Sequence, residues 1–293
     1  MLEISELRKR FAPEGKVALD GVSFSVRPGE MFGFVGANGA GKTTTMRIVM
    51  GVLQQDSGEV TWQGSPLTFA ERRRIGYMPE ERGLYQKMRV AEQIEYFGRL
   101  HGLDPEPARK ATDALIERLG LGERRGDAVE ALSLGNQQRV QLAVALVHDP
   151  DVLILDEPFS GLDPIAVDAL ASALLERARG GVPVIFSSHQ LELVERLCDS
   201  VGIVARGRMV ASGTVADLRA AEGRTLKVVV RDAAPGWADG LPGDLTVNGD
   251  RQVLMTATGD DQEILSRAVK AGRVEHFGLE QPTLTEIFKE AVA

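Results

Sequence analysis

Short apolar runs and wider helical patterns alternate along much of the chain. Each run is rich in β-branched residues and is bounded by turn residues, as buried strands are. The runs predict strands at Val22–Val26, Met31–Val35, Val152–Leu155 and Val184–Phe186. Helical patterns lie between several of these runs, and this alternation indicates an α/β core.

The segment from about Val90 to Pro150 has a different pattern. Apolar residues recur there at helical spacing, and no strand intervenes. They form two sets, Val90, Ile94 and Phe97, followed by Ala111, Leu115 and Leu119. We therefore expect a helical insertion over about residues 90–150 of the core.

After Ala221 the pattern changes again and predicts a mixture of strands and helices. The expected strands are Leu226–Val230, Val253–Ala257 and Val274–Gly278, with a loop at residues 233–243 after the first. One expected helix buries Ile264, Leu265, Ala268 and Val269; a second begins at a capping box, Thr283 and Glu286, and buries Leu284, Ile287, Phe288 and Ala291. We expect a core domain at residues 1–221 and a small α+β accessory domain at residues 222–293.

Composition and charge exclude several classes of protein. Of the 293 residues, 43% are hydrophobic and 26% are charged, which is ordinary for a folded protein. No apolar stretch reaches the roughly 18–20 residues that cross a bilayer, and the start shows no secretory signal. A single cysteine, Cys198, leaves no internal disulfide, so we expect a cytoplasmic protein. A net charge of −8 argues against nucleic acid as a partner.

Residues 36–43 match the phosphate-binding pattern G-x-x-x-x-G-K-[ST], directly after a predicted strand and directly before a helical pattern. The glycines let backbone N–H groups curl around a phosphate at a helix N-terminus. We expect Lys42 to contact the β- and γ-phosphates of ATP, and the Thr43 hydroxyl to ligate Mg²⁺. The expected nucleotide-binding residues are Gly36, Ala37, Asn38, Gly39, Ala40, Gly41, Lys42, Thr43 and Thr44.

Two carboxylates, Asp156 and Glu157, directly follow the predicted strand Val152–Leu155. A parallel strand would deliver them to the ligand edge of the sheet. Asp156 is then a candidate Mg²⁺ ligand, and Glu157 is the expected general base that orients the attacking water. His189 follows another predicted strand and would reach the γ-phosphate at the same edge, although a lone histidine at a strand end is more often structural.

Together these residues resemble the ATPases of ABC transporters, in the expected order over roughly residues 1–221. The specific marker is the segment at residues 132–139, which looks like the family signature. Without the family, this segment would indicate only the start of a helix. The resemblance implies that Ser133 and Gly135 bind the γ-phosphate held by a second subunit. Ser133 is a good helix N-cap, and Gly135 lets a phosphate approach the backbone.

Two further matches support the same family. Ser160-Gly161-Leu162-Asp163 resembles its subunit-contact loop, which brings Asp163 to the nucleotide. Phe11 stands where the family stacks an aromatic ring on adenine, although it also fits an apolar strand end. The resemblance implies a head-to-tail dimer, of one chain or of paired ATPase subunits, that closes on two ATP molecules.

Glu80 departs from the family, which usually has a glutamine at this position. The resemblance implies that this carboxylate faces Mg²⁺ and the attacking water, where it adds negative charge and has Arg82 as a candidate partner. The alternative is that Glu80 points to solvent and meets a membrane partner. Leu134 and Asn136 also replace the usual glycine and glutamine of the signature.

The segment at residues 79–85 and the extra C-terminal domain look most like the bacterial exporter branch, which includes sodium- and drug-efflux ATPases. This resemblance implies a separately encoded membrane permease, with the chain bound to the inner face of the membrane. One alternative is an ABC ATPase acting on ribosomes or DNA, but the chain lacks a second ATPase unit, long coiled coils and basic patches. A stand-alone P-loop kinase or GTPase would leave residues 133–138 and His189 without a role.

Overall fold

The computed structural model describes residues 1–12, 15–81, 83–221 and 225–292. The chain divides into two compact units, Met1–Thr214 and Val215–Ala293. The sequence predicts the boundary at Ala221 instead. The difference arises because helix α8 (Val215–Ala221) contacts helix α10 (Leu284–Val292), so α8 folds with the C-terminal residues.

The first unit contains a six-stranded sheet in the order β10-β9-β3-β8-β7-β6. All neighbouring strands are parallel except β10, which runs antiparallel to β9. The α/β core with a P-loop NTPase arrangement is therefore confirmed. The strands are β3 (Met31–Val35), β6 (Ile75–Met78), β7 (Val152–Leu155), β8 (Val184–Ser188), β9 (Ser200–Ala205) and β10 (Arg208–Thr214).

A second sheet in this unit is antiparallel, in the order β2-β1-β4-β5. Strand β2 begins at Val17, earlier than the predicted Val22, because Gly21 at φ +83° interrupts the apolar alternation. The strands are β1 (Leu2–Arg10), β2 (Val17–Val26), β4 (Ser57–Trp62) and β5 (Ser65–Pro66). Both sheets and α1 share one apolar core, in which Phe24 stacks on Phe32 at 4.8 Å.

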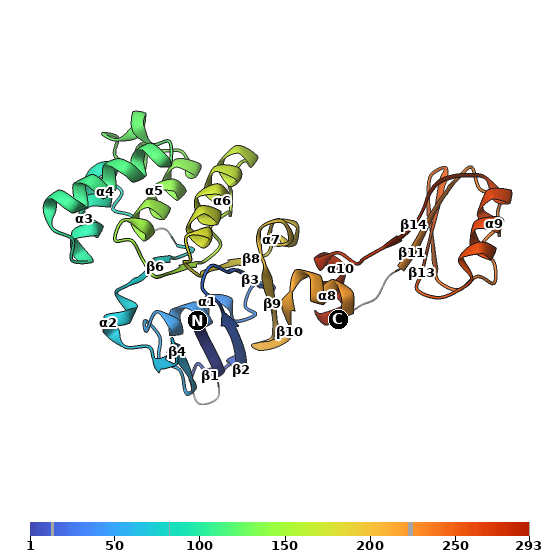
Figure 1. Cartoon of the computed structure of the whole chain (residues 1–293), viewed down its shortest axis with the longest axis horizontal. Coiled ribbons are helices and arrows are strands. Elements are labelled where there is room, and N and C mark those ends of the chain that lie inside the picture. The colour runs from blue at the N-terminus through green and yellow to red at the C-terminus, as the bar shows by residue number, and fades with distance from the viewer. Residues whose placement is uncertain (13–14, 82, 222–224, 293) are drawn as a thin grey trace. The chain divides into compact units, whose positions relative to one another are not determined.

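Helices α3, α4 and α5 lie side by side between β6 and β7 in the chain, and Figure 1 shows them in green. They confirm the predicted helical insertion. Shorter one-turn 3₁₀ segments, Gly122–Arg124 and Val129–Ala131, join α4 to α5. The helices of the first unit are α1 (Lys42–Val49), α2 (Phe69–Arg72), α3 (Val90–Leu100), α4 (Pro105–Arg118), α5 (Leu134–Leu146), α6 (Pro164–Arg179) and α7 (Leu191–Leu197).

The second unit is a four-stranded antiparallel sheet, in the order β12-β13-β11-β14, with helix α9 packed on β11 and β14. It confirms the small α+β domain of the predicted fold. Strand β12 lies outside the predicted strands because every one of its residues is exposed, which leaves no apolar alternation. The elements are β11 (Thr225–Arg231), β12 (Asp244–Asn248), β13 (Arg251–Thr256), α9 (Asp261–Ala271) and β14 (Arg273–Glu280).

Two predicted helix faces in this unit are only partly right. In α9, Ile264 and Ala268 are buried and Leu265 is half-buried, whereas Val269 is 61% exposed, because it lies about 100° further round the helix than Ala268. In α10, Leu284 and Ile287 are buried, but Phe288 and Ala291 are half-buried. The predicted capping box is confirmed, since Thr283 N–H donates to Glu286 Oε2 at 2.7 Å and Glu286 N–H donates to Thr283 Oγ1 at 3.3 Å.

No helix in the part of the chain that the structure describes has the length and apolar character needed to span a bilayer.

Candidate functional site

The segment between β3 and α1 forms a tight loop whose glycines are sterically required. A Cβ on Gly36 would lie 2.5 Å from the carbonyl oxygen of Val204. Gly41 has φ +118°, which L side chains rarely adopt, and it immediately precedes the first residue of α1. The loop therefore brings its backbone N–H groups to a helix N-terminus, where an anion is favoured.

Lys42 is the first residue of α1, and its side chain is only 6% exposed. Its Nζ donates to the Gly36 carbonyl oxygen at 2.6 Å and lies 3.5 Å from Glu157 Oε1. A buried ammonium needs such partners, because removing a charge from water is costly. The contact joins the phosphate-binding loop to the carboxylate that follows β7.

A pocket of about 420 Å³ opens beside this loop. It brings together Phe11, the loop, Glu80 and Glu157, which are far apart in the sequence. Phe11 is 48% exposed at the pocket wall, so its ring is accessible to a ligand. The lining residues are Phe11, Lys16, Ala18, Ala37, Asn38, Gly39, Gly41, Lys42, Thr43, Thr44, Glu80 and Glu157.

Asp156 and Glu157 sit at the carboxyl end of β7 and are both buried. The Ser187 hydroxyl donates to Asp156 Oδ1 at 2.6 Å and accepts from Glu157 N–H at 2.8 Å, so it fixes both residues. Glu157 has φ +51°, a strained conformation for a non-glycine residue. Such strain persists only where the surroundings hold it, as the Ser187 bond does here.

His189 contacts Glu157 rather than lining the pocket. Its Nδ1 lies 2.9 Å from Glu157 Oε2, and its side chain is 54% exposed. Glu157 therefore has Lys42 beside one carboxylate oxygen and His189 beside the other. This geometry holds the carboxylate in one orientation.

The oxygen donors near the loop fit Mg²⁺. Asp156 Oδ2 is buried and has no hydrogen-bond partner, which is costly unless a cation or water satisfies it. The Thr43 hydroxyl and the Glu80 carboxylate line the adjacent pocket, and oxygen ligands are the ones Mg²⁺ prefers. Among the described residues, no cluster of three or more His, Cys, Asp and Glu side chains could hold a metal alone. Phosphate and water oxygens would have to complete its shell.

Ser133, Gly135 and Asp163 lie apart from this pocket, since none of them lines it. Ser133 caps α5, and its Oγ accepts from Asn136 N–H at 3.4 Å. Asp163 caps α6, with its Oδ1 accepting from Ala166 N–H at 2.9 Å. Both Ser133 and Asp163 are exposed, so the N-termini of two helices face outward.

Glu80 is exposed at the end of β6 and also lines the pocket. The neighbouring Pro79 carbonyl accepts from Gln141 Nε2 of α5 at 2.6 Å, which ties this segment to the helical insertion. The expected pairing of Glu80 with Arg82 concerns a residue outside those that the structure describes.

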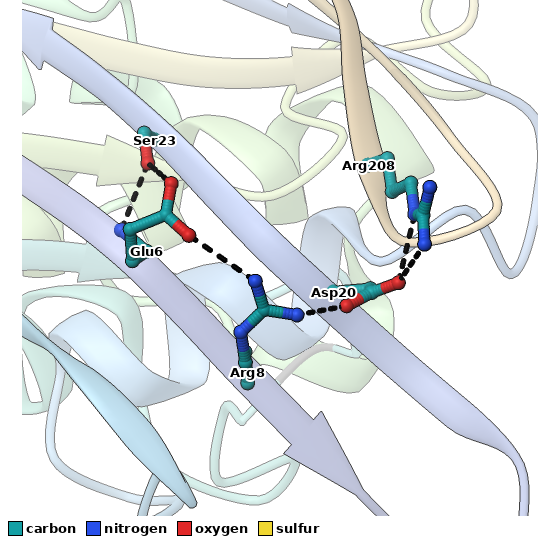
Figure 2. Close-up of polar contacts among 5 residues, drawn as sticks. All are labelled: Glu6, Arg8, Asp20, Ser23 and Arg208. Atoms are coloured by element: carbon teal, nitrogen blue, oxygen red, sulfur yellow. Dashed lines mark hydrogen bonds and ion pairs between the residues drawn. The ribbon is translucent and has the colours of Figure 1, made fainter.

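Figure 2 shows a polar network that joins β10 to strands β1 and β2 of the antiparallel sheet. Asp20 accepts from Arg8 and from Arg208, and Glu6 bonds to Arg8 and Ser23. The bond from Arg208 is the main reason that the pKa of Asp20 lies below its usual value. The adjacent Gly207 N–H donates to the Ala40 carbonyl of the phosphate-binding loop at 2.9 Å, so the start of β10 supports that loop.

Sequence reasoning missed three residues of this site. Lys16 and Ala18 line the pocket but belong to no motif, and Ser187 joins the two carboxylates from a neighbouring strand. A polar residue at the end of the apolar run Val184–Phe186 was the available signal for Ser187. For Lys16 the available signal was a cation close in sequence to Phe11.

Two family models match the chain. The one described as ABC transporter matches residues 19–160, and the one described as the C-terminal domain of DrrA1-3-like ATP-binding proteins matches residues 213–292. The first match lies within the unit Met1–Thr214, and the second covers nearly all of the unit Val215–Ala293.

Named relatives cover nearly the whole chain. The uncharacterized ABC transporter ATP-binding protein YhaQ of Bacillus subtilis is 38% identical over 295 residues, covering 100% of this chain and 98% of YhaQ. The daunorubicin resistance ATP-binding protein DrrA3 of Streptomyces coeruleorubidus is 35% identical, covering 93% of this chain and 90% of DrrA3. A solved ATP-binding subunit of an ABC transporter superposes with a TM-score of 0.70 at 32% identity, covering 76% of this chain and 93% of the other.

Proposed function

This chain belongs to the family of ABC transporter ATP-binding proteins, and we propose that it works as a dimer that hydrolyses ATP to power export by a separate membrane permease. The observation that carries the proposal is a single pocket that joins the phosphate-binding loop, Phe11 and Glu157. Glu157 is fixed there by Lys42, Ser187 and His189.

In the proposed reaction, ATP lies with its adenine against Phe11 and its β- and γ-phosphates at the loop and Lys42. Glu157 accepts a proton from water as the water oxygen attacks the γ-phosphorus. The bond between that phosphorus and the β–γ bridging oxygen breaks, which releases ADP and inorganic phosphate. His189 orients the Glu157 carboxylate through the contact at 2.9 Å. Thr43, Asp156 and Glu80 would hold Mg²⁺, which would supply positive charge to the phosphates.

The outward-facing helix N-termini support the dimer. Ser133 and Gly135 begin α5, and Asp163 caps α6, yet none of them lines the pocket of its own chain. An exposed helix N-terminus favours an anion. We infer that Ser133 and Gly135 meet the γ-phosphate bound by the other subunit of a head-to-tail pair, and that Asp163 lies at the contact between the two subunits.

An apolar cavity of about 270 Å³ supports docking of the permease. It lies between the helical insertion and the segment after β6, and its lining includes Pro79, Leu84 and Phe97. At its rim, Tyr85 is 51% exposed and packs against Tyr96 and Phe97. Exposed aromatic and apolar side chains of this kind are typical of protein interfaces. Docking here would place the chain on the inner face of the membrane.

The proposed direction of transport rests on the names of similar proteins. Those named for a process include a daunorubicin resistance protein and a Nod factor export protein of Ralstonia nicotianae, which is 34% identical over 263 residues. We therefore propose export. No pocket residue of an ATPase subunit has to contact the transported solute, so the proposal names no cargo.

Replacing Glu157 with Gln tests the assigned base. Turnover is expected to fall about 100-fold or more, while ATP binding persists and an ATP-dependent dimer appears on size-exclusion chromatography. Lys42→Ala is the comparison variant, and it should weaken ATP binding itself. Wild-type turnover in Glu157→Gln would show that another group activates the water, and an unchanged ATP affinity in Lys42→Ala would contradict the phosphate-binding role of the loop.

A further inference from the structure

Lys16 and Phe11 face each other where β1 passes into β2. Phe11 N–H donates to the Lys16 carbonyl oxygen at 3.2 Å, next to the strand pair Arg10 and Val17. Both side chains line the nucleotide pocket. The β1–β2 connection therefore presents an aromatic ring and an ammonium group to the same space.

The ammonium group of Lys16 lies over the phosphate-binding loop. A Cβ built on Gly39 would be 3.4 Å from Lys16 Nζ, although the two residues lie in different connections, between β1 and β2 and between β3 and α1. Gly39 is exposed and has φ +78°, a conformation that favours glycine. Because glycine has no side chain, nothing at this position separates Lys16 from the loop backbone. Lys16 thus approaches the loop at Gly39, whereas the buried Lys42 bonds to the Gly36 carbonyl.

The two lysines differ in their partners. Lys42 donates to the Gly36 carbonyl and lies beside Glu157. In the part of the chain that the structure describes, the Lys16 ammonium forms no ion pair and no hydrogen bond. A cation held beside an anion-binding loop without an acidic partner is available to the anion itself.

We propose that Lys16 binds the α-phosphate of the nucleotide, an assignment that rests on the proposed function of the pocket. The base is placed by Phe11, and the β- and γ-phosphates by Lys42 and the N-terminus of α1. The α-phosphate lies between these two groups in ATP, as Lys16 lies between Phe11 and the loop. Lys16 therefore contributes to affinity for ATP and ADP alike, whereas Glu157 acts on the γ-phosphate alone.

Lys16→Met in the full-length chain tests this role. The Kd values for ATP and for ADP should both rise by a similar factor, roughly fivefold, the scale of a partly exposed ion pair. The KM for ATP should change more than kcat, and Lys16→Arg should restore most of the affinity because it keeps the charge. Lys110→Met is the matched control: Lys110 lies on α4 and pairs with Glu106 at 2.9 Å, so the same charge is lost far from the pocket.

The outcomes separate this inference from the proposed function. Unchanged Kd values in Lys16→Met overturn the assignment, as does an equal loss in Lys110→Met. A loss for ATP without a loss for ADP would place Lys16 at the γ-phosphate and also overturns it. If the wild-type chain binds neither nucleotide, the proposed function itself fails.

Discussion

At the scale of single residues, the site is organised around the Glu157 carboxylate. One oxygen lies 3.5 Å from Lys42 Nζ and the other 2.9 Å from His189 Nδ1. The backbone of Glu157 is held at φ +51° with its N–H donating to Ser187. A general base must point at one water position, and these contacts restrict the rotation that would misdirect it.

Glu80 places a further negative charge at the pocket, and Glu80→Gln tests its effect. As a Mg²⁺ ligand, Glu80 attracts the cation but repels the triphosphate. The variant should therefore bind ATP more tightly without Mg²⁺, by roughly threefold, and need more Mg²⁺ for half-maximal turnover. Both values are obtained by titration, of ATP in the presence of a chelator and of Mg²⁺ at saturating ATP.

Glu81→Gln is the matched control, because Glu81 is the adjacent acid, is exposed and does not line the pocket. Identical behaviour of the two variants would mean that Glu80 acts only through net charge. Unchanged Mg²⁺ dependence in Glu80→Gln would support the alternative role at the permease.

The sequence predicts the residues of the site that belong to recognisable motifs and misses those that belong to none. The phosphate-binding loop and the pair Asp156 and Glu157 are readable because their spacing along the chain reflects their geometry. Lys16 depends on how β1 turns into β2, and Ser187 depends on the parallel pairing of β7 with β8. The first relation is local but belongs to no sequence motif, and the second joins residues that are 30 positions apart.

At the scale of elements, the start of α5 and the loop before α6 are packed together. A Cβ on Gly161 would lie 2.7 Å from Leu134 Cδ2, and Gly161 has φ +72°. Gln138 Nε2 of α5 also donates to the Pro158 carbonyl at 3.0 Å. These contacts fix the position of the α5 N-terminus relative to the α6 N-terminus.

Gly161→Ala should strain this contact. Alanine at positive φ costs about 1 kcal/mol or more, which lowers Tm by roughly 2–4 °C for a unit of this size. Circular dichroism measures the shift. Gly126→Ala is the control, because a Cβ there would meet nothing within 4 Å and its φ lies outside the positive range. An equal shift in both variants would contradict the strain argument.

Elements with a strong hydrophobic pattern have the bounds that the sequence predicts, whereas elements without such a pattern were not predicted. Strands β3 and β7 have the predicted bounds because both are buried throughout. Strand β12 is fully exposed and leaves no apolar signal, so its pairing with β13 could not be read from the sequence.

At the scale of the whole molecule, the chain consists of two units that each have their own core. Every residue that lines the nucleotide pocket lies in Met1–Thr214. The second unit has a separate apolar cluster that includes Leu226, Trp237 and Ile264. Separate cores are the usual basis for independent folding.

Ending the chain after Thr214 should therefore preserve ATP binding, with a Kd within about twofold of the full-length value. A matched truncation after Ala205 also removes Gly207 and Arg208, which bond to Ala40 and Asp20. That shorter chain should bind ATP less tightly or fail to fold, as isothermal titration and circular dichroism would show. Loss of ATP binding in the longer truncation would mean that the first unit depends on the second.

The partners of Lys42 also affect the expected rate of nucleotide dissociation. Its Nζ is bonded to the Gly36 carbonyl and lies beside Glu157, so a bound triphosphate has to compete with two acceptors of the protein. This competition cancels part of the association free energy. As ADP dissociates, the Gly36 carbonyl and Glu157 can bond to the Lys42 ammonium again. The buried ammonium is therefore never left without a partner, a state that would be costly. With Lys42 in its proposed role, we infer that this exchange lowers the barrier to product release and favours rapid renewal of the site over tight retention of the nucleotide.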